Sequence, residues 1–142
     1  QAGCAVTYRP PEDWTVHSSS KQQLTASSGD GLRMLMRRYT TPAKKSARDV
    51  GQELIQQASR KGWLVLEERP LPSASADLES YEVLLEEMHP GAAGIETLWL
   101  TRGVVQPTSA GSNVAVVEVL GRGPVLRHHQ EALTEGFGQL LP

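Results

Sequence analysis

Three long strand-like segments follow one another in the second half of the chain, and they constrain the fold most strongly. Leu78 to Met88 alternates apolar residues with glutamates, Ile95 to Val105 continues the apolar pattern, and Val114 to Leu120 is almost entirely apolar. Alternation with a period of two places every second side chain on one face of a sheet. Turn-like segments separate the three, including the polar segment Pro107 to Ser112, which we predict to be a loop, so we expect antiparallel pairing. The run Val114 to Leu120 predicts a central strand that is covered on both faces.

Further strands are predicted nearer the N-terminus. Gln22 to Ser27 and Leu32 to Thr40 flank the loop Ser28-Gly29-Asp30-Gly31, whose residues are typical of a hairpin. In the second of these strands Leu32, Met34 and Met36 would share the buried face, and Arg33 and Arg37 would point the other way. Trp63 to Glu68 is a short apolar run that predicts one more strand.

Two amphipathic helices are predicted to cover this sheet. The first runs from Ala47 to Lys61, with Ser46 as its N-cap, Asp49 in a capping-box position and Gly62 as its C-terminal stop. Its apolar side consists of Val50, Leu54, Ile55 and Ala58. The second runs from Val125 to Leu141, and its apolar side consists of Leu126, Leu133, Phe137, Leu140 and Leu141.

Together these elements predict an α+β fold, in which an antiparallel β-sheet is flanked by two helices as an α/β/α sandwich. The chain has 142 residues, of which 39% are hydrophobic and 21% charged, and this suits a single folded domain. We assign residues 14–142 to that domain and residues 1–13 to an N-terminal lipid-attachment or linker segment. The net charge of −2 argues against nucleic acid as a partner.

Charge is distributed unevenly along the chain. Residues 1–63 carry ten basic and five acidic side chains, and residues 64–142 carry four and eleven. The favoured interpretation is that the two halves interleave in one sheet, so that their charges meet as weak surface pairs. The alternative is a molecule with one basic face, formed by Arg33, Arg37, Arg38, Lys44, Lys45 and Arg48.

The only cysteine, Cys4, lies in the run Gln1-Ala2-Gly3-Cys4-Ala5. Small residues before a lone cysteine are typical of the modified cysteine of bacterial lipoproteins, so we predict membrane attachment through a lipid on Cys4. Gln1 stands where such a signal has Leu, and a free thiol near the terminus is the alternative. One cysteine excludes an intramolecular disulfide. No run approaches the ~20 apolar residues of a membrane-spanning helix.

Sequence motifs of catalysis and cofactor binding are absent: there is no phosphate loop, GxGxxG or GxSxG. The pair His128-His129 lacks the i and i+4 spacing that would place two metal ligands on one helix face. Glu67-Glu68 and Glu86-Glu87 are predicted to be solvated carboxylates. We therefore predict a protein without catalytic residues, metal or cofactor.

One segment carries a resemblance to a known family. Tyr8-Arg9-Pro10-Pro11-Glu12-Asp13-Trp14-Thr15-Val16 resembles the P-x-x-W-x-V entry of PsbP-like domains. The order of hairpin, middle helix, long strands and closing helix is similar over nearly the whole chain from Tyr8. The resemblance implies an α/β/α sandwich that binds or stabilises proteins without catalysis, as in DcrB-type envelope lipoproteins and Eag-type chaperones. No binding residue of the family can be assigned to a position here.

Two functions remain open on this basis. The first is a non-catalytic bacterial envelope lipoprotein, anchored on the periplasmic side through Cys4, that serves as a protein-binding or assembly module. The second is a soluble, cytoplasmic chaperone or adaptor for secreted or membrane proteins, whose sheet face would hold apolar helices. A large exposed apolar surface would favour the second function. A small hydrolase is a third, less favoured possibility.

Overall fold

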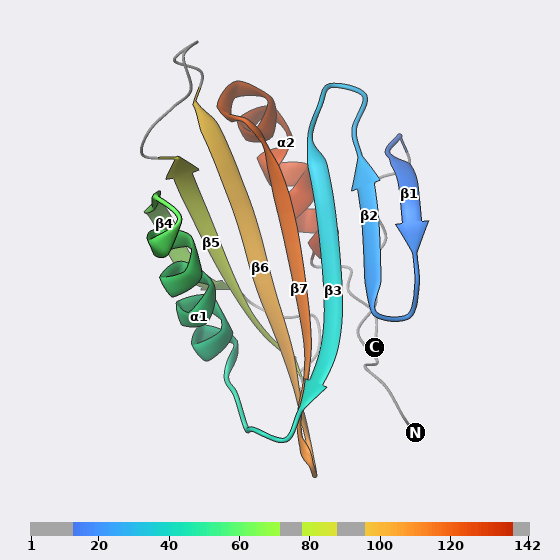
Figure 1. Cartoon of the computed structure of the whole chain (residues 1–142), viewed down its shortest axis with the longest axis vertical. Coiled ribbons are helices and arrows are strands. Elements are labelled where there is room, and N and C mark those ends of the chain that lie inside the picture. Colours follow the sequence, from blue (N-terminus) through green and yellow to red (C-terminus); the bar gives the residue numbers. More distant parts are fainter. Residues whose placement is uncertain (1–12, 72–77, 88–95, 138–142) are drawn as a thin grey trace.

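The computed structural model describes residues 13–71, 78–87 and 96–137, which form one seven-stranded antiparallel sheet and two helices (Figure 1). The strand order is β1-β2-β3-β7-β6-β5-β4, and the predicted α+β class is confirmed. The elements are β1 (Thr15–Ser19), β2 (Gln23–Ser27), β3 (Arg33–Thr41), α1 (Ala47–Arg60), β4 (Trp63–Leu71), β5 (Glu79–Glu87), β6 (Thr97–Thr108), β7 (Gly111–Arg122) and α2 (Gly123–Phe137).

The predicted central strand is confirmed, because β7 lies between β3 and β6 in the middle of the sheet. Its side chains alternate between two apolar clusters: Val117 and Val119 belong to one, and Val114 and Val116 to the other. β1 to β3 and β4 to β7 are each built from consecutive strands, and the two groups join where β3 pairs with β7. The two halves of the chain thus share a single sheet, but their strands lie side by side and meet only where β3 pairs with β7. The predicted interleaving of the two halves is wrong.

Local sequence signals set the bounds of α1 and of the β2–β3 hairpin. The Ser46 hydroxyl accepts a hydrogen bond from the Asp49 amide at 3.0 Å, and the Asp49 carboxylate accepts one from the Ser46 amide at 2.9 Å. This is the predicted capping box. The helix ends before Gly62, whose φ of +87° is a left-handed conformation that glycine adopts without strain. Gly31 serves the hairpin loop in the same way, with φ +99°.

The helix α1 packs against β4, β5 and β6 on one face of the sheet. Two glycines allow α1 to approach the sheet closely. A Cβ built on Gly51 of the helix would meet the ring of Tyr81, and a Cβ on Gly103 of β6 would lie 2.8 Å from Cγ1 of Val50. The backbones of helix and sheet are thus closer than larger residues would permit.

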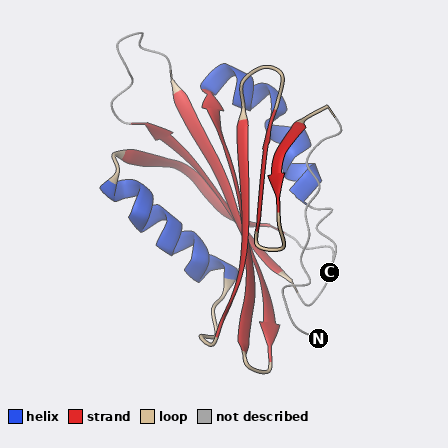
Figure 2. Ribbon diagram, turned by 45° about the vertical axis from the view of Figure 1, so that its right-hand side comes forward, coloured by secondary structure: helices blue, strands red, loops and turns tan. Residues whose placement is uncertain are grey.

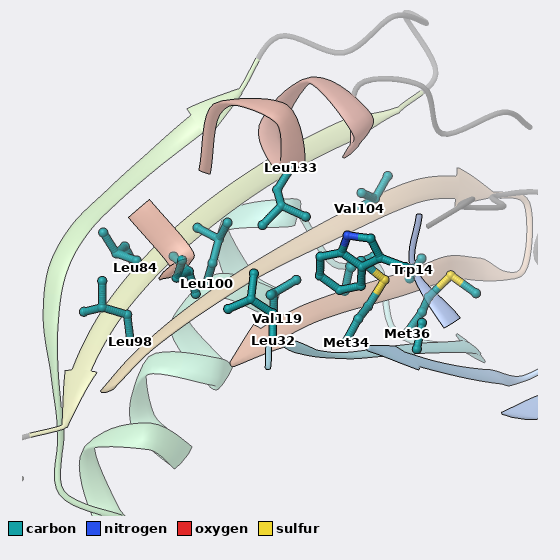
Figure 3. Close-up of a cluster of buried hydrophobic side chains, with 14 of the residues drawn as sticks. Trp14, Leu32, Met34, Met36, Leu84, Leu98, Leu100, Val104, Val119 and Leu133 are labelled. Atoms are coloured by element: carbon teal, nitrogen blue, oxygen red, sulfur yellow. The ribbon is translucent and has the colours of Figure 1, made fainter. Parts of the chain in front are cut away.

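The second helix, α2, packs against β6 and β7, and Figure 2 shows the sheet between the two helices. Leu126 and Leu133 of α2 are fully buried, as predicted. They share their cluster with Trp14, Met34 and Met36, which continue the apolar core beyond the helix (Figure 3). The predicted contacts of Phe137, Leu140 and Leu141 lie outside the described side chains.

Three strand boundaries differ from the sequence prediction. The strand β1 was not predicted, since all five of its residues are exposed and most are polar; backbone pairing with β2 forms it. The polar segment 107–112 was predicted to be a loop, which is wrong, because ladder pairing continues from Pro107↔Ser112 to Thr108↔Gly111. β4 continues through Pro70, which an edge strand tolerates because it needs hydrogen bonds on one side only.

Candidate binding groove

An open groove lies on the α1 face of the sheet. Because α1 packs on β4 to β6 only, no described helix covers β1, β2 and β3 on this face (Figure 1). The space beside α1 has a volume of about 700 Å³, within the range of ligand-binding sites. We call it the groove; it is lined by His17, Gln23, Thr25, Ala26, Ser27, Arg33, Met34, Leu35, Lys61, Trp63, Trp99, Glu118 and Leu120.

The floor of the groove is apolar and partly exposed. Leu120 of β7 has 38% of its surface accessible, and Leu35, Trp63 and Trp99 are half-buried. The rings of Trp63 and Trp99 meet edge to face, with centroids 5.4 Å apart and planes at 73°. Strand pairing aligns Trp99 with Leu120 and Leu120 with Arg33. The floor therefore combines Leu35 of β3 and Leu120 of β7, on strands that α1 does not pack against, with Trp63 of β4 and Trp99 of β6, which lie beside α1.

The carboxylate of Glu118 lies in this apolar floor. Its side chain is 16% accessible, and one oxygen is 3.4 Å from a guanidinium nitrogen of Arg37. Burial raises the pKa of the Glu118 carboxyl above its ordinary value, and the charges of Arg37 and Lys61 oppose the rise. The ion pair is long and half-exposed on the arginine side, so it holds Glu118 only weakly.

Hydroxyl and imidazole groups form the outer side of the groove on β1 and β2. His17 Nε2 is 2.6 Å from the Ser27 hydroxyl, and the Ser18 and Thr25 hydroxyls are 2.6 Å apart. These hydrogen bonds between side chains link β1 and β2 in addition to the backbone pairing of the two strands. They give the groove a polar side opposite the tryptophans.

The residues singled out in the sequence lie elsewhere or are dispersed. Cys4 falls outside the described residues, so lipid attachment stays a prediction. His129 Nε2 is 2.7 Å from a carboxylate oxygen of Asp30, in the β2–β3 loop, and its ring meets that of His128 edge to face. Within the described residues no group of three or more His, Cys, Asp or Glu side chains could hold a metal ion.

The six basic residues considered as one basic face do not lie together. Arg33 and Arg37 lie on the groove face of β3, and strand alternation places Arg38 on the opposite face. The Lys45 ammonium pairs with the Glu53 carboxylate of α1 at 2.6 Å. Only part of this set therefore contributes charge to the groove.

Sequence reasoning did not identify the groove. Its apolar residues come from β3, β4, β6 and β7, and nothing in the sequence tells which of these strands a helix leaves uncovered. The one available signal was Leu35, which lies between Arg33 and Arg37 on the face opposite the buried methionines. Such a residue indicates a partly apolar surface on the polar side of a strand.

Neither a scan of known protein families nor a search of curated proteins finds a match to this chain. Among solved structures, one match is PA94 from Pseudomonas aeruginosa, a protein of unknown function described as a candidate regulator. The two chains are 10% identical, the alignment covers 96% of each, and the TM-score is 0.57. At this identity the similarity concerns the fold alone. No helix in the described part of the chain is long and apolar enough to span a membrane.

Proposed function

We propose that this protein is a non-catalytic binding module that holds an apolar helix of a partner protein in the groove, as a chaperone or an assembly factor does. The observation that carries the proposal is the partly exposed apolar floor of Leu35, Trp63, Trp99 and Leu120. Leu35 and Leu120 lie on strands that α1 does not pack against, and the two tryptophans lie beside α1 on β4 and β6. Burying apolar surface of this kind contributes about 25 cal/mol per Å². Tryptophan is also enriched among the interface residues that dominate binding.

The dimensions of the uncovered surface favour a helix as the occupant. Neighbouring strands lie about 4.8 Å apart, so β1, β2, β3 and the adjoining end of β7, where Leu120 is exposed, span about 14 Å. A helix with its side chains is about 10–12 Å across, and one helix would therefore cover this half of the face. On the other half α1 does the same over three strands.

The resemblance of the entry segment to PsbP-like domains supports the same class of function, since that superfamily binds or stabilises proteins from an α/β/α sandwich. Its order of elements agrees with a sheet that carries one helix on each face. We retain the PsbP-like resemblance as part of the proposal.

Binding of a defined peptide tests the proposal. The probe is a synthetic helix with a leucine- and alanine-rich core and glutamine flanks, added to the full chain while tryptophan fluorescence is recorded. Trp63 and Trp99 lie in the groove, and Trp14 is buried in the other cluster, so a spectral change reports on the groove. We expect saturable binding that Leu120→Gln weakens by about tenfold or more.

The matched control is Leu64→Gln, because Leu64 is 51% accessible and lies outside the groove lining. This variant should bind like the wild type. Absence of saturable binding, or equal loss in both variants, would contradict the proposed function.

A second candidate function is supported by the residues around Cys4. Lipidation there would make the protein an envelope lipoprotein on the periplasmic side, whereas an unmodified thiol leaves the cytoplasmic chaperone. The intact mass of the protein expressed from its full-length gene in a bacterial host distinguishes the two. A diacylglyceryl mass increment on Cys4 supports the envelope, and an unmodified Cys4 on a chain that retains its upstream residues contradicts it.

A further inference from the structure

We propose that the groove selects an amphipathic helix whose apolar stripe is bordered on both sides by aspartate or glutamate. The proposal rests on the proposed function and specifies the chemistry of the partner. It follows from the charges that surround the apolar floor.

Basic side chains outnumber acidic ones around the groove. Arg33 and Lys61 line it, and neither forms an ion pair with another described residue. Glu118 is the one carboxylate among the described lining residues, and Arg37 pairs with it from beside the groove. Two cations against one anion give the described lining a charge of +1, opposite in sign to the net charge of −2 of the whole chain. Such a local reversal of sign attracts an anionic partner to this surface.

Arg33 and Lys61 lie on different sides of the floor. Arg33 belongs to β3, on one side of Leu120 and Trp99 in the strand order. Lys61 is the C-cap of α1, on the other side. A helix lying on Leu120 and Trp99 would therefore have a cation along each border of its apolar stripe. Acidic side chains at both borders would pair with them, as charged residues do beside the apolar seam of a coiled coil.

Glu118 favours the same kind of partner, because it repels carboxylates at the centre of the apolar stripe. Because it is largely buried in the floor, a second carboxylate placed directly above it would be disfavoured, so acids are accepted at the borders but not in the centre of the stripe. A cation on the occupant would compete with Arg37 for Glu118, but it would also meet Arg33 and Lys61. The groove thus distinguishes partner helices by the position of their charged residues as well as by the sign of the charge.

Three peptides with one apolar core test the proposal. Their stripes are bordered by glutamate, glutamine or lysine, and their affinities are measured by tryptophan fluorescence. We expect the glutamate peptide to bind most tightly and the lysine peptide most weakly, with a difference of about tenfold or more at low salt. The difference should shrink in about 1 M salt, where the Debye length is about 3 Å.

Charge-removal variants provide the controls. Arg33→Gln combined with Lys61→Gln should abolish the preference for glutamate and leave binding of the glutamine peptide within about twofold of wild type. Lys44→Gln combined with Arg48→Gln removes two exposed cations at the opposite end of α1, outside the groove lining, and should leave the preference intact.

The outcomes separate this proposal from the proposed function. If all three peptides bind equally and Leu120→Gln weakens each, the binding function stands and the acidic preference is refuted. If no peptide binds, the proposed function fails as well. A dimer of the chain that dissociates on Leu120→Gln, seen by sedimentation without any peptide, would identify a second copy as the occupant and overturn the proposal.

Discussion

Replacing Gly51 with alanine tests how closely α1 approaches the sheet. In an isolated helix this change is favourable by about 1 kcal/mol, because glycine is a poor helix former. In this structure the new Cβ would lie 3.0 Å from Cε2 and 3.3 Å from Cγ of Tyr81, and closer still to Cδ2. The ring of Tyr81 is 7% accessible, and its hydroxyl donates to a Glu68 carboxylate oxygen at 2.6 Å. The ring therefore has little freedom to move away.

Overpacking of this kind typically costs about 1–3 kcal/mol, and the restricted ring places Gly51→Ala towards the upper end. After subtraction of the helix propensity gain, we expect a net loss of about 1–2 kcal/mol in the free energy of unfolding. Urea unfolding followed by circular dichroism measures it, with an unchanged m-value as the sign that only stability has changed.

A double-mutant cycle separates the two contributions. In a Tyr81→Leu background the ring is absent, so Gly51→Ala should stabilise the protein by up to about 1 kcal/mol. The sign of the effect of Gly51→Ala should thus reverse between the two backgrounds. Stabilisation by Gly51→Ala in the wild type would refute the close approach of helix and sheet.

Further substitutions test the core, the helix cap and the buried carboxylate. Leu133→Ala, at a fully buried position, should cost about 2–5 kcal/mol in urea unfolding, and Leu64→Ala, at a half-exposed position, less than about 1 kcal/mol. Ser46→Ala removes the N-cap acceptor and should cost about 0.5–2 kcal/mol in thermal unfolding. Hydrogen bonds from the Ser46 backbone and side chain lower the pKa of the Asp49 carboxyl. The stability that these bonds provide is therefore present above the unfolded-state pKa of Asp49 and is lost as pH falls through its folded-state pKa. The destabilisation caused by Ser46→Ala should accordingly be smaller in acid. Burial raises the pKa of the Glu118 carboxyl. The wild type should therefore lose stability relative to Glu118→Gln as pH rises through the folded-state pKa of Glu118. Parallel pH profiles of urea unfolding for the two proteins would contradict this loss of stability.

Several elements could be predicted because their determinants are local. The bounds of α1 follow from the capping box of Ser46 and Asp49 and from Gly62, all within a few residues of the helix ends. The β2–β3 hairpin follows from its loop residues. The central position of β7 follows from its continuous apolar composition, because only a strand covered on both faces needs it.

Other features depend on contacts between distant parts of the chain. The strand β1 has no apolar pattern, and it exists because β2 offers it backbone partners. The extension of β6 and β7 through residues 107–112 depends on ladder pairing, which is indifferent to the polarity of the side chains. Neither feature could be predicted from periodicity, which reports burial rather than hydrogen bonding.

The sequence by itself determined which residues share a face of each strand, since alternation follows from the geometry of the extended backbone. It thereby placed Arg33, Leu35 and Arg37 together, opposite Met34 and Met36. Only the tertiary structure decided which part of that face stays open. The position of α1 over β4 to β6 depends on the fit of Gly51 against Tyr81 and of Val50 against Gly103, and these pairs are far apart in the chain. That fit leaves the α1 face of β1 to β3 without a helix in the described structure, and the groove is the physical consequence.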